Sequence, residues 1–131
     1  MRDEENFHRA LQLSTTFINV DYCAQILHPT LPSSTLEVDN YAQKGATIFV
    51  FEGKATDEDG AISQLQKRHQ SFTLFKDHYL KFKHFSTYTR VRLFYYSFKK
   101  KTFAEYDSRG KKLSSVKFPD VNVLASLLGN L

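Results

Sequence analysis

The fold of this chain is decided by two strand patterns and the turn between them, in residues 36–54, LEVDNYAQKGATIFVFEGK. Apolar and polar residues alternate over Leu36–Tyr41, which is typical of a strand with one buried face. Residues 43–45 predict a turn. Thr47–Lys54 predicts the returning strand, and its Ile-Phe-Val-Phe centre indicates burial on both faces. We therefore expect a β-hairpin whose second strand lies inside the protein.

The segments before this hairpin are less uniform. Asp3–Phe17 predicts a helix, because its apolar residues share one face and its acids fall in the first turn. Ile18–Leu27 either extends that helix or forms a short strand, and its periodicity does not decide between them. His28–Ser34 contains two prolines and two serines, which predicts a loop.

The segments after the hairpin complete an α/β pattern. We expect a helix over Ala61–Tyr79, strands over Arg90–Phe98, Thr102–Tyr106 and Lys112–Phe118, turns at Lys99–Lys101 and Ser108–Gly110, and a last helix over Val121–Leu128 ended by Gly129. The order of helix, hairpin, helix, strands and helix predicts a central mixed β-sheet flanked by helices. The 131 residues fit one domain, residues 1–131.

Composition excludes several classes of protein. The single cysteine, Cys23, cannot form an internal disulfide or a thiolate zinc cluster, so we expect a reducing, intracellular and cytoplasmic setting. No apolar run approaches the roughly 18 residues that a membrane span needs. The acidic start, Asp3–Glu5, is unlike a secretory or mitochondrial signal. We therefore expect no membrane partner.

Charge is segregated along the chain. Residues 1–60 hold four Lys/Arg against ten Asp/Glu, whereas residues 61–117 hold fourteen against three. Thirteen of the nineteen aromatic residues lie in residues 61–131. Basic and aromatic side chains together favour a nucleic-acid partner, through phosphate contacts and base stacking. A solvated basic face that binds nothing is the alternative.

The hairpin also brings carboxylates together. If it turns about residues 44 and 45, Glu37 lies opposite Glu52, and Asp39 lies opposite Val50. Like charges across a strand pair destabilise it, and burial raises the cost of keeping them ionised. A hard cation such as Mg²⁺ offsets this repulsion and leaves room for a substrate phosphate.

Lys54 lies on the same face as Glu52 in this arrangement. Beside a metal, the lysine can stabilise the charge on a phosphate or help to deprotonate the attacking water. A surface ion pair between Glu52 and Lys54 is the simpler interpretation of such a short pattern. The buried run before Glu52, the spacing from Asp39 and the helix that follows favour the metal site.

Residues 37–68, EVDNYAQKGATIFVFEGKATDEDGAISQLQKR, resemble the core of the PD-(D/E)XK nucleases, the restriction-endonuclease-like superfamily. They look most like the small members related to Holliday-junction resolvases and Mrr-type restriction enzymes, in which an E-x-D strand, a turn and a hydrophobic strand ending in E-x-K follow one another. Asp39 matches the first acid, Glu52 the second and Lys54 the lysine. Val38 stands where many members have proline, and Gly53 is an unusual middle residue.

The resemblance implies a restriction-endonuclease-like fold and a Mg²⁺-dependent deoxyribonuclease, with Mn²⁺ as a substitute. A helix after E-x-K often carries a glutamine near the site, and an acid from the first helix often joins the metal shell. The implied catalytic residues are Asp39, Glu52, Lys54 and Gln64, and the implied metal ligands are Asp39, Glu52, the Gly53 carbonyl and Glu5. Gln66 and Glu4 are the alternatives to Gln64 and Glu5.

DNA is the expected partner, and RNA stays open. The candidate nucleic-acid contacts are Lys67, Arg68, Arg90, Arg92, Lys99, Lys100 and Lys101. A nuclease-fold protein without activity, serving as a nucleic-acid-binding or assembly subunit, is the alternative function. A homodimer through the apolar helix Val121–Leu128 is a further expectation. A compact nuclease of this kind suits a virus, a mobile element or a repair pathway, and a viral protein would act in the host cytoplasm.

Overall fold

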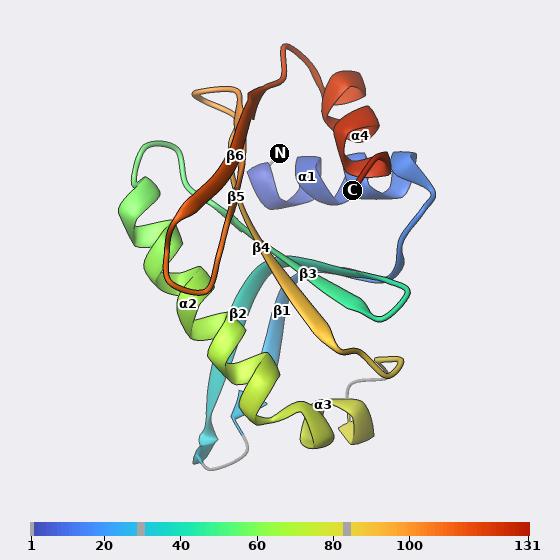
Figure 1. The fold of residues 1–131 in the computed structure, drawn as a ribbon, viewed down its shortest axis with the longest axis vertical. Helices are drawn as coiled ribbons and strands as arrows, with labels where there is room; N and C mark the ends of the chain where they lie inside the picture. Colours follow the sequence, from blue (N-terminus) through green and yellow to red (C-terminus); the bar gives the residue numbers. More distant parts are fainter. Residues whose placement is uncertain (1, 29–30, 83–84) are drawn as a thin grey trace.

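The protein is an α/β fold in which helices cover both faces of one β-sheet, seen in a computed structural model that describes residues 2–28, 31–82 and 85–131 (Figure 1). Its elements are α1 (Asp3–Ser14), β1 (Ile18–His28), β2 (Leu31–Lys44), β3 (Thr47–Gly53), α2 (Glu58–Leu74), α3 (Lys76–Phe82), β4 (Arg90–Ser97), β5 (Thr102–Tyr106), β6 (Lys112–Lys117) and α4 (Val121–Gly129). Within these described residues, six strands lie in chain order, and only β3 and β4 are parallel. The mixed sheet flanked by helices is confirmed.

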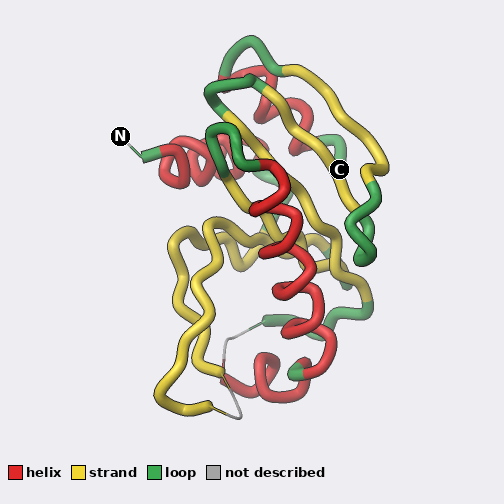
Figure 2. The backbone as a smooth tube through the Cα atoms, turned by 90° about the vertical axis from the view of Figure 1, so that its left-hand side faces the viewer, coloured by secondary structure: helices red, strands yellow, loops and turns green. Residues whose placement is uncertain are grey.

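Two separate cores lie on the two faces of this sheet. The helix α2 runs along one face, and α1 and α4 lie side by side on the other (Figures 1 and 2). The first core includes Val50 from β3 and Leu65 from α2. The second includes Phe51 from β3 and Phe7 from α1. Adjacent residues of β3 therefore face different cores, as the pleat of a strand requires.

The central strand β3 explains how the sheet is ordered. Its residues 48–52 are all buried, which confirms that it is covered on both faces. It pairs with β4 in parallel, from Thr47 beside Arg90 to Gly53 beside Tyr96. Because parallel strands end at the same edge, the chain that leaves Gly53 starts next to the chain that leaves Tyr96.

The hairpin of β2 and β3 is confirmed, but its predicted register is wrong by two residues. Tyr41, not Asp39, lies opposite Val50. The reason is the turn, which is formed by Gly45 and Ala46, with Lys44 paired to Thr47. Gly45 has a φ of 58°, a conformation that glycine adopts without steric cost. Moving the turn along the chain brings Asp39, rather than Glu37, next to Glu52.

The structure resolves the segment that periodicity left open and corrects the loop beside it. Residues 18–28 form a strand, β1. The predicted loop at 28–34 is wrong at His28, which ends β1, and over residues 31–34, which belong to β2, while residues 29 and 30 lie outside the described part of the chain. Strand structure tolerates Pro32 because the β1–β2 pairing is irregular here, with Leu31 and Thr35 as the neighbouring paired residues.

The predicted helix over 61–79 is two helices. The chain leaves α2 at Phe75, whose φ of −108° and ψ of 27° are not helical, and α3 begins at Lys76. This change of direction lets Tyr79 pack edge-on against Phe72, with ring centroids 5.3 Å apart. The other predicted elements are confirmed, with ends that differ by a residue or a few.

A buried amide holds the hairpin to its surroundings. Gln43 is fully buried, and its side chain donates to the carbonyls of Gly45 and Ser86 at 3.2 and 2.8 Å. Its Oε1 accepts from Asn19 Nδ2 at 2.7 Å and from the Ser86 amide at 3.1 Å. One side chain therefore links β1, the hairpin turn and the segment before β4.

The C-terminal helix uses its apolar face within the chain. Leu124 and Leu128 are buried in the core that α4 shares with α1, and Val121 and Val123 are each 36% exposed. A dimer through this helix would therefore have only its outer residues for contact. None of the helices in the described residues is long and apolar enough to cross a lipid bilayer.

Candidate functional site

A small pocket lies where β2, β3 and α2 meet. Its volume is about 160 Å³, and its lining residues are Glu37, Asp39, Lys54, Gln64 and Arg68. Asp39 comes from β2, Lys54 follows β3 directly, and Gln64 and Arg68 project from α2. The two strands and the helix that the sequence singled out thus contribute to one concave surface.

Glu52 lies beneath this lining and is fully buried. Among the described residues, neither of its carboxyl oxygens makes a hydrogen bond of good geometry, although a side-chain contact with Asp39 contributes to its raised pKa. Burial, followed by the charge of Asp39, raises the pKa of Glu52 to about 9. The charges of Arg68 and Lys54 act in the opposite direction and only partly offset this rise in pKa.

Arg68 supplies part of the missing positive charge. Its Nε lies 3.6 Å from Glu52 Oε1, which is an ion-pair distance but too long for a good hydrogen bond. The Arg68 Nη2 donates to the backbone carbonyl of Glu37. Only 9% of Arg68 is exposed, so this residue belongs to the floor of the pocket, whereas the sequence suggested it as a nucleic-acid contact.

Asp39 is fixed by the strand that carries Glu52. Its Oδ2 accepts a hydrogen bond of 2.9 Å from the amide of Gly53. The neighbouring residue, Asn40, is buried, and its amide donates to the Glu4 carbonyl at 3.0 Å while its Oδ1 accepts from Tyr96 Oη at 2.6 Å. The start of α1 is therefore attached next to Asp39.

Tyr96 explains the unusual glycine between Glu52 and Lys54. A Cβ on Gly53 would lie 2.4 Å from Cζ of Tyr96, which is buried and stacked on Phe7 with centroids 4.0 Å apart. No larger residue fits Gly53 unless this ring moves. Burial and then the charge of Asp39 raise the pKa of Tyr96, which keeps its hydroxyl a hydrogen-bond donor.

The two residues that the sequence proposed to serve the reaction both reach the pocket. Backbone contacts hold Lys54, because its amide donates to the Tyr96 carbonyl at 3.2 Å and its carbonyl accepts from Tyr95 Oη at 3.0 Å. Gln64 lines the pocket, whereas Gln66 donates to the Ser108 carbonyl at 3.3 Å, near the β5–β6 turn. Gln64 is thus the glutamine at this site.

The acid proposed from the first helix is placed differently. Glu5 lies 3.7 Å from Arg2 in an exposed ion pair. Glu4 is the residue whose carbonyl contacts Asn40, and its charge acts on Tyr96. Within the described residues, no three His, Cys, Asp or Glu side chains form a group that could hold a metal ion.

The donor set nevertheless suits a magnesium ion. Mg²⁺ takes oxygen ligands and typically needs only one or two carboxylates, with waters completing its shell. Asp39, the carboxylate of Glu52 and the Gly53 carbonyl are such oxygens. The unsatisfied oxygens of Glu52 are the feature of this site that a cation would resolve.

The basic residues proposed to bind nucleic acid fall into different places. Arg92 is committed to Glu105, with hydrogen bonds of 2.8 and 2.7 Å, and its guanidinium lies over the ring of Phe94. Lys67 and Arg90 are exposed. The lysines at 99–101 are also exposed and form the β4–β5 turn, at the same end of the sheet as Lys54.

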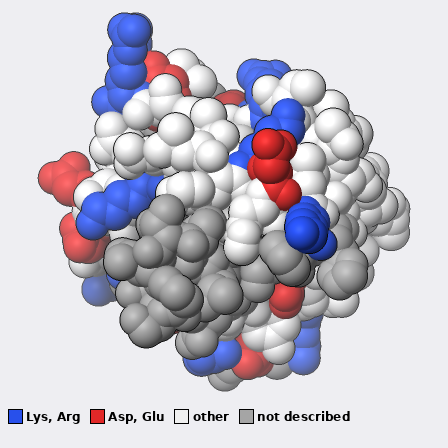
Figure 3. Space-filling model, turned by 90° about the horizontal axis from the view of Figure 1, so that it is seen from below, with Lys and Arg blue, Asp and Glu red and all other residues white. Residues whose placement is uncertain are grey.

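The segregated charges of the sequence do not form one basic patch on the face in Figure 3. Lys and Arg side chains there alternate with Asp and Glu side chains. Ion pairs also join the acidic and basic halves of the chain, among them Lys112 with Glu58 at 3.4 Å. On the face in Figure 3, the basic side chains therefore do not form one continuous patch.

Sequence reasoning missed the residues that support the pocket from a distance. Tyr95, Tyr96 and Asn40 carried no motif, and Arg68 was expected to contact nucleic acid. The contacts of Tyr96 arise from the parallel pairing of β3 with β4. The glycine in the E-x-K pattern was the one available signal, because a missing side chain often marks a close neighbour.

Comparison with models of protein families, with curated proteins and with solved structures finds no match to this chain.

Proposed function

We propose that this protein is a Mg²⁺-dependent nuclease that hydrolyses DNA phosphodiester bonds at a PD-(D/E)XK site. The observation that carries the proposal is the buried carboxylate of Glu52, which makes no hydrogen bond of good geometry among the described residues and lies next to Asp39. A second supporting observation is the pocket beside it, which Lys54 and Gln64 line as the resemblance implies.

The residues have distinct roles in this proposal. Asp39, Glu52 and the Gly53 carbonyl hold the metal, which when bound supplies an activated water and neutralises charge on the phosphate. Lys54 binds a phosphate oxygen or takes a proton from the water. Gln64 orients the water and the phosphate by hydrogen bonding.

One further feature supports nucleic acid as the substrate. The exposed lysines at 99–101 lie at the end of the sheet where β3 and β4 both finish, so a bound strand at the pocket would pass near them. Lysine side chains at such a turn bind phosphates without reading the base sequence. Endonucleolytic and exonucleolytic cleavage both agree with this arrangement.

Arg68 favours a second candidate function, a nucleic-acid-binding or assembly protein without catalytic activity. Its guanidinium lies 3.6 Å from Glu52, so a protein cation already stands beside the buried acid. If Arg68 alone compensates the negative charge of Glu52, the site needs no metal.

Cleavage separates the two candidates. The full chain is incubated with linear, circular, single-stranded and branched DNA and with RNA, in Mg²⁺ or Mn²⁺. The variants are Asp39→Asn, Glu52→Gln and Lys54→Gln. Asp59→Asn is the matched control, because Asp59 is an exposed acid outside the pocket lining. Electrophoresis measures products, and fluorescence anisotropy measures binding in the same samples.

The nuclease proposal expects products from the wild type and the control, and a loss of at least about 100-fold in rate in the three site variants, on the scale of removing one charge-stabilising group. Salt-sensitive binding without products on any substrate would contradict the nuclease and support the binding protein. Absence of binding at low salt would contradict both.

A further inference from the structure

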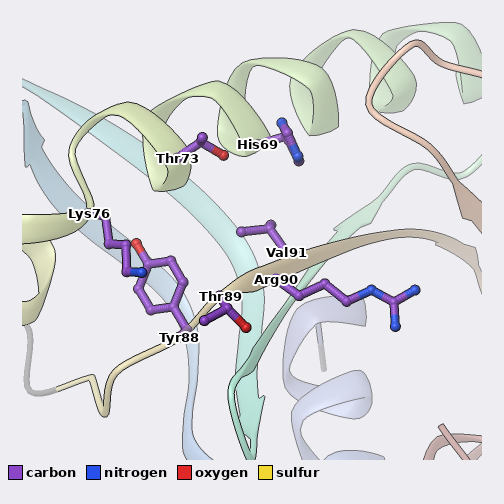
Figure 4. A pocket seen from close by; sticks show the side chains of 7 residues that line it. All are labelled: His69, Thr73, Lys76, Tyr88, Thr89, Arg90 and Val91. Carbon is purple, nitrogen blue, oxygen red and sulfur yellow. The ribbon is translucent and has the colours of Figure 1, made fainter.

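A second pocket lies on the face of the sheet that α2 covers, at the opposite end of β4 from Lys54. Its volume is about 370 Å³, and Figure 4 shows the seven residues that line it: His69, Thr73, Lys76, Tyr88, Thr89, Arg90 and Val91. The two pockets share no lining residue, although Arg68 of the first and His69 of the second are neighbours on α2. The second pocket is therefore distinct from the site of Glu52, and it goes beyond the proposed nuclease activity.

The lining has the chemistry of an anion site. Three of the seven residues carry basic side chains, two are threonines, and none of these described residues carries a carboxylate. His69 and Thr73 project from α2 toward β4 in Figure 4. Carboxylates do lie nearby, because Glu105 and Asp107 line the adjoining pocket and the charge of Asp77 acts on Tyr88.

One cation is held in place by an aromatic ring. Lys76 Nζ lies 5.4 Å from the ring centroid of Tyr88, within the range of a cation–π interaction. The Tyr88 hydroxyl donates to the Phe72 carbonyl at 2.6 Å, so this ring is itself fixed. The ammonium group of Lys76 thus lies against a fixed ring, and an ammonium group can donate to the oxygens of an anion.

We propose that this pocket binds a phosphate group through Lys76, His69 and the hydroxyls of Thr73 and Thr89. The volume is at the lower end of the range for small-molecule sites, roughly 300 to 1,000 Å³, and is too small for a duplex. The phosphate belongs to a free nucleotide or inorganic phosphate, or to the backbone of a single strand.

Calorimetric titration of the full chain tests this proposal. The titrants are inorganic phosphate, a nucleoside 5′-monophosphate and a short single-stranded oligonucleotide without a terminal phosphate, all in a metal chelator. The lining variants are Lys76→Gln and His69→Gln. Lys111→Gln is the control, because Lys111 is exposed in the β5–β6 turn and lies outside the pocket. Circular dichroism confirms that each variant is folded.

The wild type and the control are expected to bind phosphate equally, and each lining variant about tenfold or more weaker, as the loss of one charge-assisted hydrogen bond implies. If His69→Gln does not fold, Lys76→Gln decides. Absence of binding at millimolar phosphate, or equal binding by the lining variants and the control, overturns the proposal.

The titrants identify the source of the phosphate. Binding of phosphate and the monophosphate alone indicates a free ligand, and equal binding of the oligonucleotide indicates a nucleic-acid backbone. The same titration with Glu52→Gln is expected to match the wild type. Phosphate binding in a protein that does not cleave, or cleavage without phosphate binding, therefore separates this proposal from the proposed nuclease.

Discussion

Glu52 is a carboxylic acid in a position where ionisation is costly, and this gives it a measurable effect on stability. Its pKa is raised from an ordinary value of 4.5 to about 9, first by burial and then by Asp39. Between these values the folded chain keeps a proton that the unfolded chain has lost. Protonated Glu52 therefore contributes fully to the stability of the folded chain below pH 4.5. This contribution is lost as the pH rises from 4.5 to about 9.

Glu52→Gln removes this titration while keeping the side-chain shape. In a metal chelator, the wild type is expected to lose stability relative to Glu52→Gln as the pH rises from about 5 to 9, with a slope of at most about 1.4 kcal/mol per pH unit. Urea unfolding of both proteins across this range measures the difference in free energy. If the free energies of unfolding of the two proteins changed with pH in parallel, this would mean that Arg68 keeps Glu52 ionised in the folded protein.

A larger residue in place of Gly53 is expected to destabilise the protein, because it would overlap the ring of Tyr96. A Cβ at residue 53 would overlap a fully buried ring, so Gly53→Ala is expected to reduce the free energy of unfolding by about 1 to 3 kcal/mol. In a Tyr96→Leu background the same substitution is expected to cost much less. Urea unfolding of the four proteins measures this coupling, and an equal cost in both backgrounds would contradict the proposed overlap.

Some residues of the candidate site could be predicted from the sequence, and others could not. The pattern of Asp39, Glu52 and Lys54 lies within one short stretch, so a hairpin suffices to bring these residues together. Arg68 and Tyr96 reach the same place through a helix and a parallel strand, whose orientations no local pattern encodes. The two-residue error in register came from placing the turn one position too early, a choice that Gly45 allows either way.

At the scale of elements, Gln43 determines how the hairpin is attached. Gln43→Leu keeps the size of the side chain but leaves the amide and carbonyl groups of Ser86 and the carbonyl of Gly45 without this partner. The expected loss in free energy of unfolding is about 2 to 4 kcal/mol, since each buried unsatisfied group costs about 1 to 3 kcal/mol and relaxation recovers a part.

Chemical denaturation measures this loss, and Gln70→Leu, at an exposed position of α2, is the control that adds the same residue without breaking these contacts. A change no larger than that of the control would show that water replaces Gln43 without cost.

Elements with a strong internal pattern were predictable, and those set by tertiary contacts were not. The strand β3 and the helix α4 carry their own apolar patterns and punctuating residues, and both are confirmed. The strand β1 has no decisive periodicity, because it is an edge strand whose pairing with β2 determines its conformation. The break at Phe75 serves the packing of Tyr79 and leaves no mark in the apolar stripe.

For the whole molecule, the sheet brings the acidic and basic halves of the chain into contact. The acidic residues of β2 and β3 meet the basic residues of α2, as in the pair of Glu52 and Arg68. Some of the charged residues therefore pair with each other inside the fold. Basic residues that stay exposed, such as the lysines at 99–101, are available to bind a polyanion.

The strongest consequence of the proposed function at this scale is that a metal ion stabilises the entire fold. Mg²⁺ that binds only the folded chain raises the free energy of unfolding, by about 2.7 kcal/mol at a hundredfold excess over its Kd. Because Glu52 must lose its proton to bind the ion, this gain is expected to grow as the pH approaches about 9. Thermal unfolding with and without Mg²⁺, at equal ionic strength, measures it.

Asp39→Asn and Glu52→Gln are expected to show no gain from Mg²⁺, whereas Asp59→Asn, which changes an exposed acid outside the pocket, responds like the wild type. An equal response of all four proteins would mean that the ion acts on general surface charge. No response in the wild type would mean that the protein's own cations, Arg68 and Lys54, act at Glu52 without a metal ion, as the binding-protein alternative requires. The pH dependence separates these cases, because only binding through Glu52 must become stronger as its proton leaves.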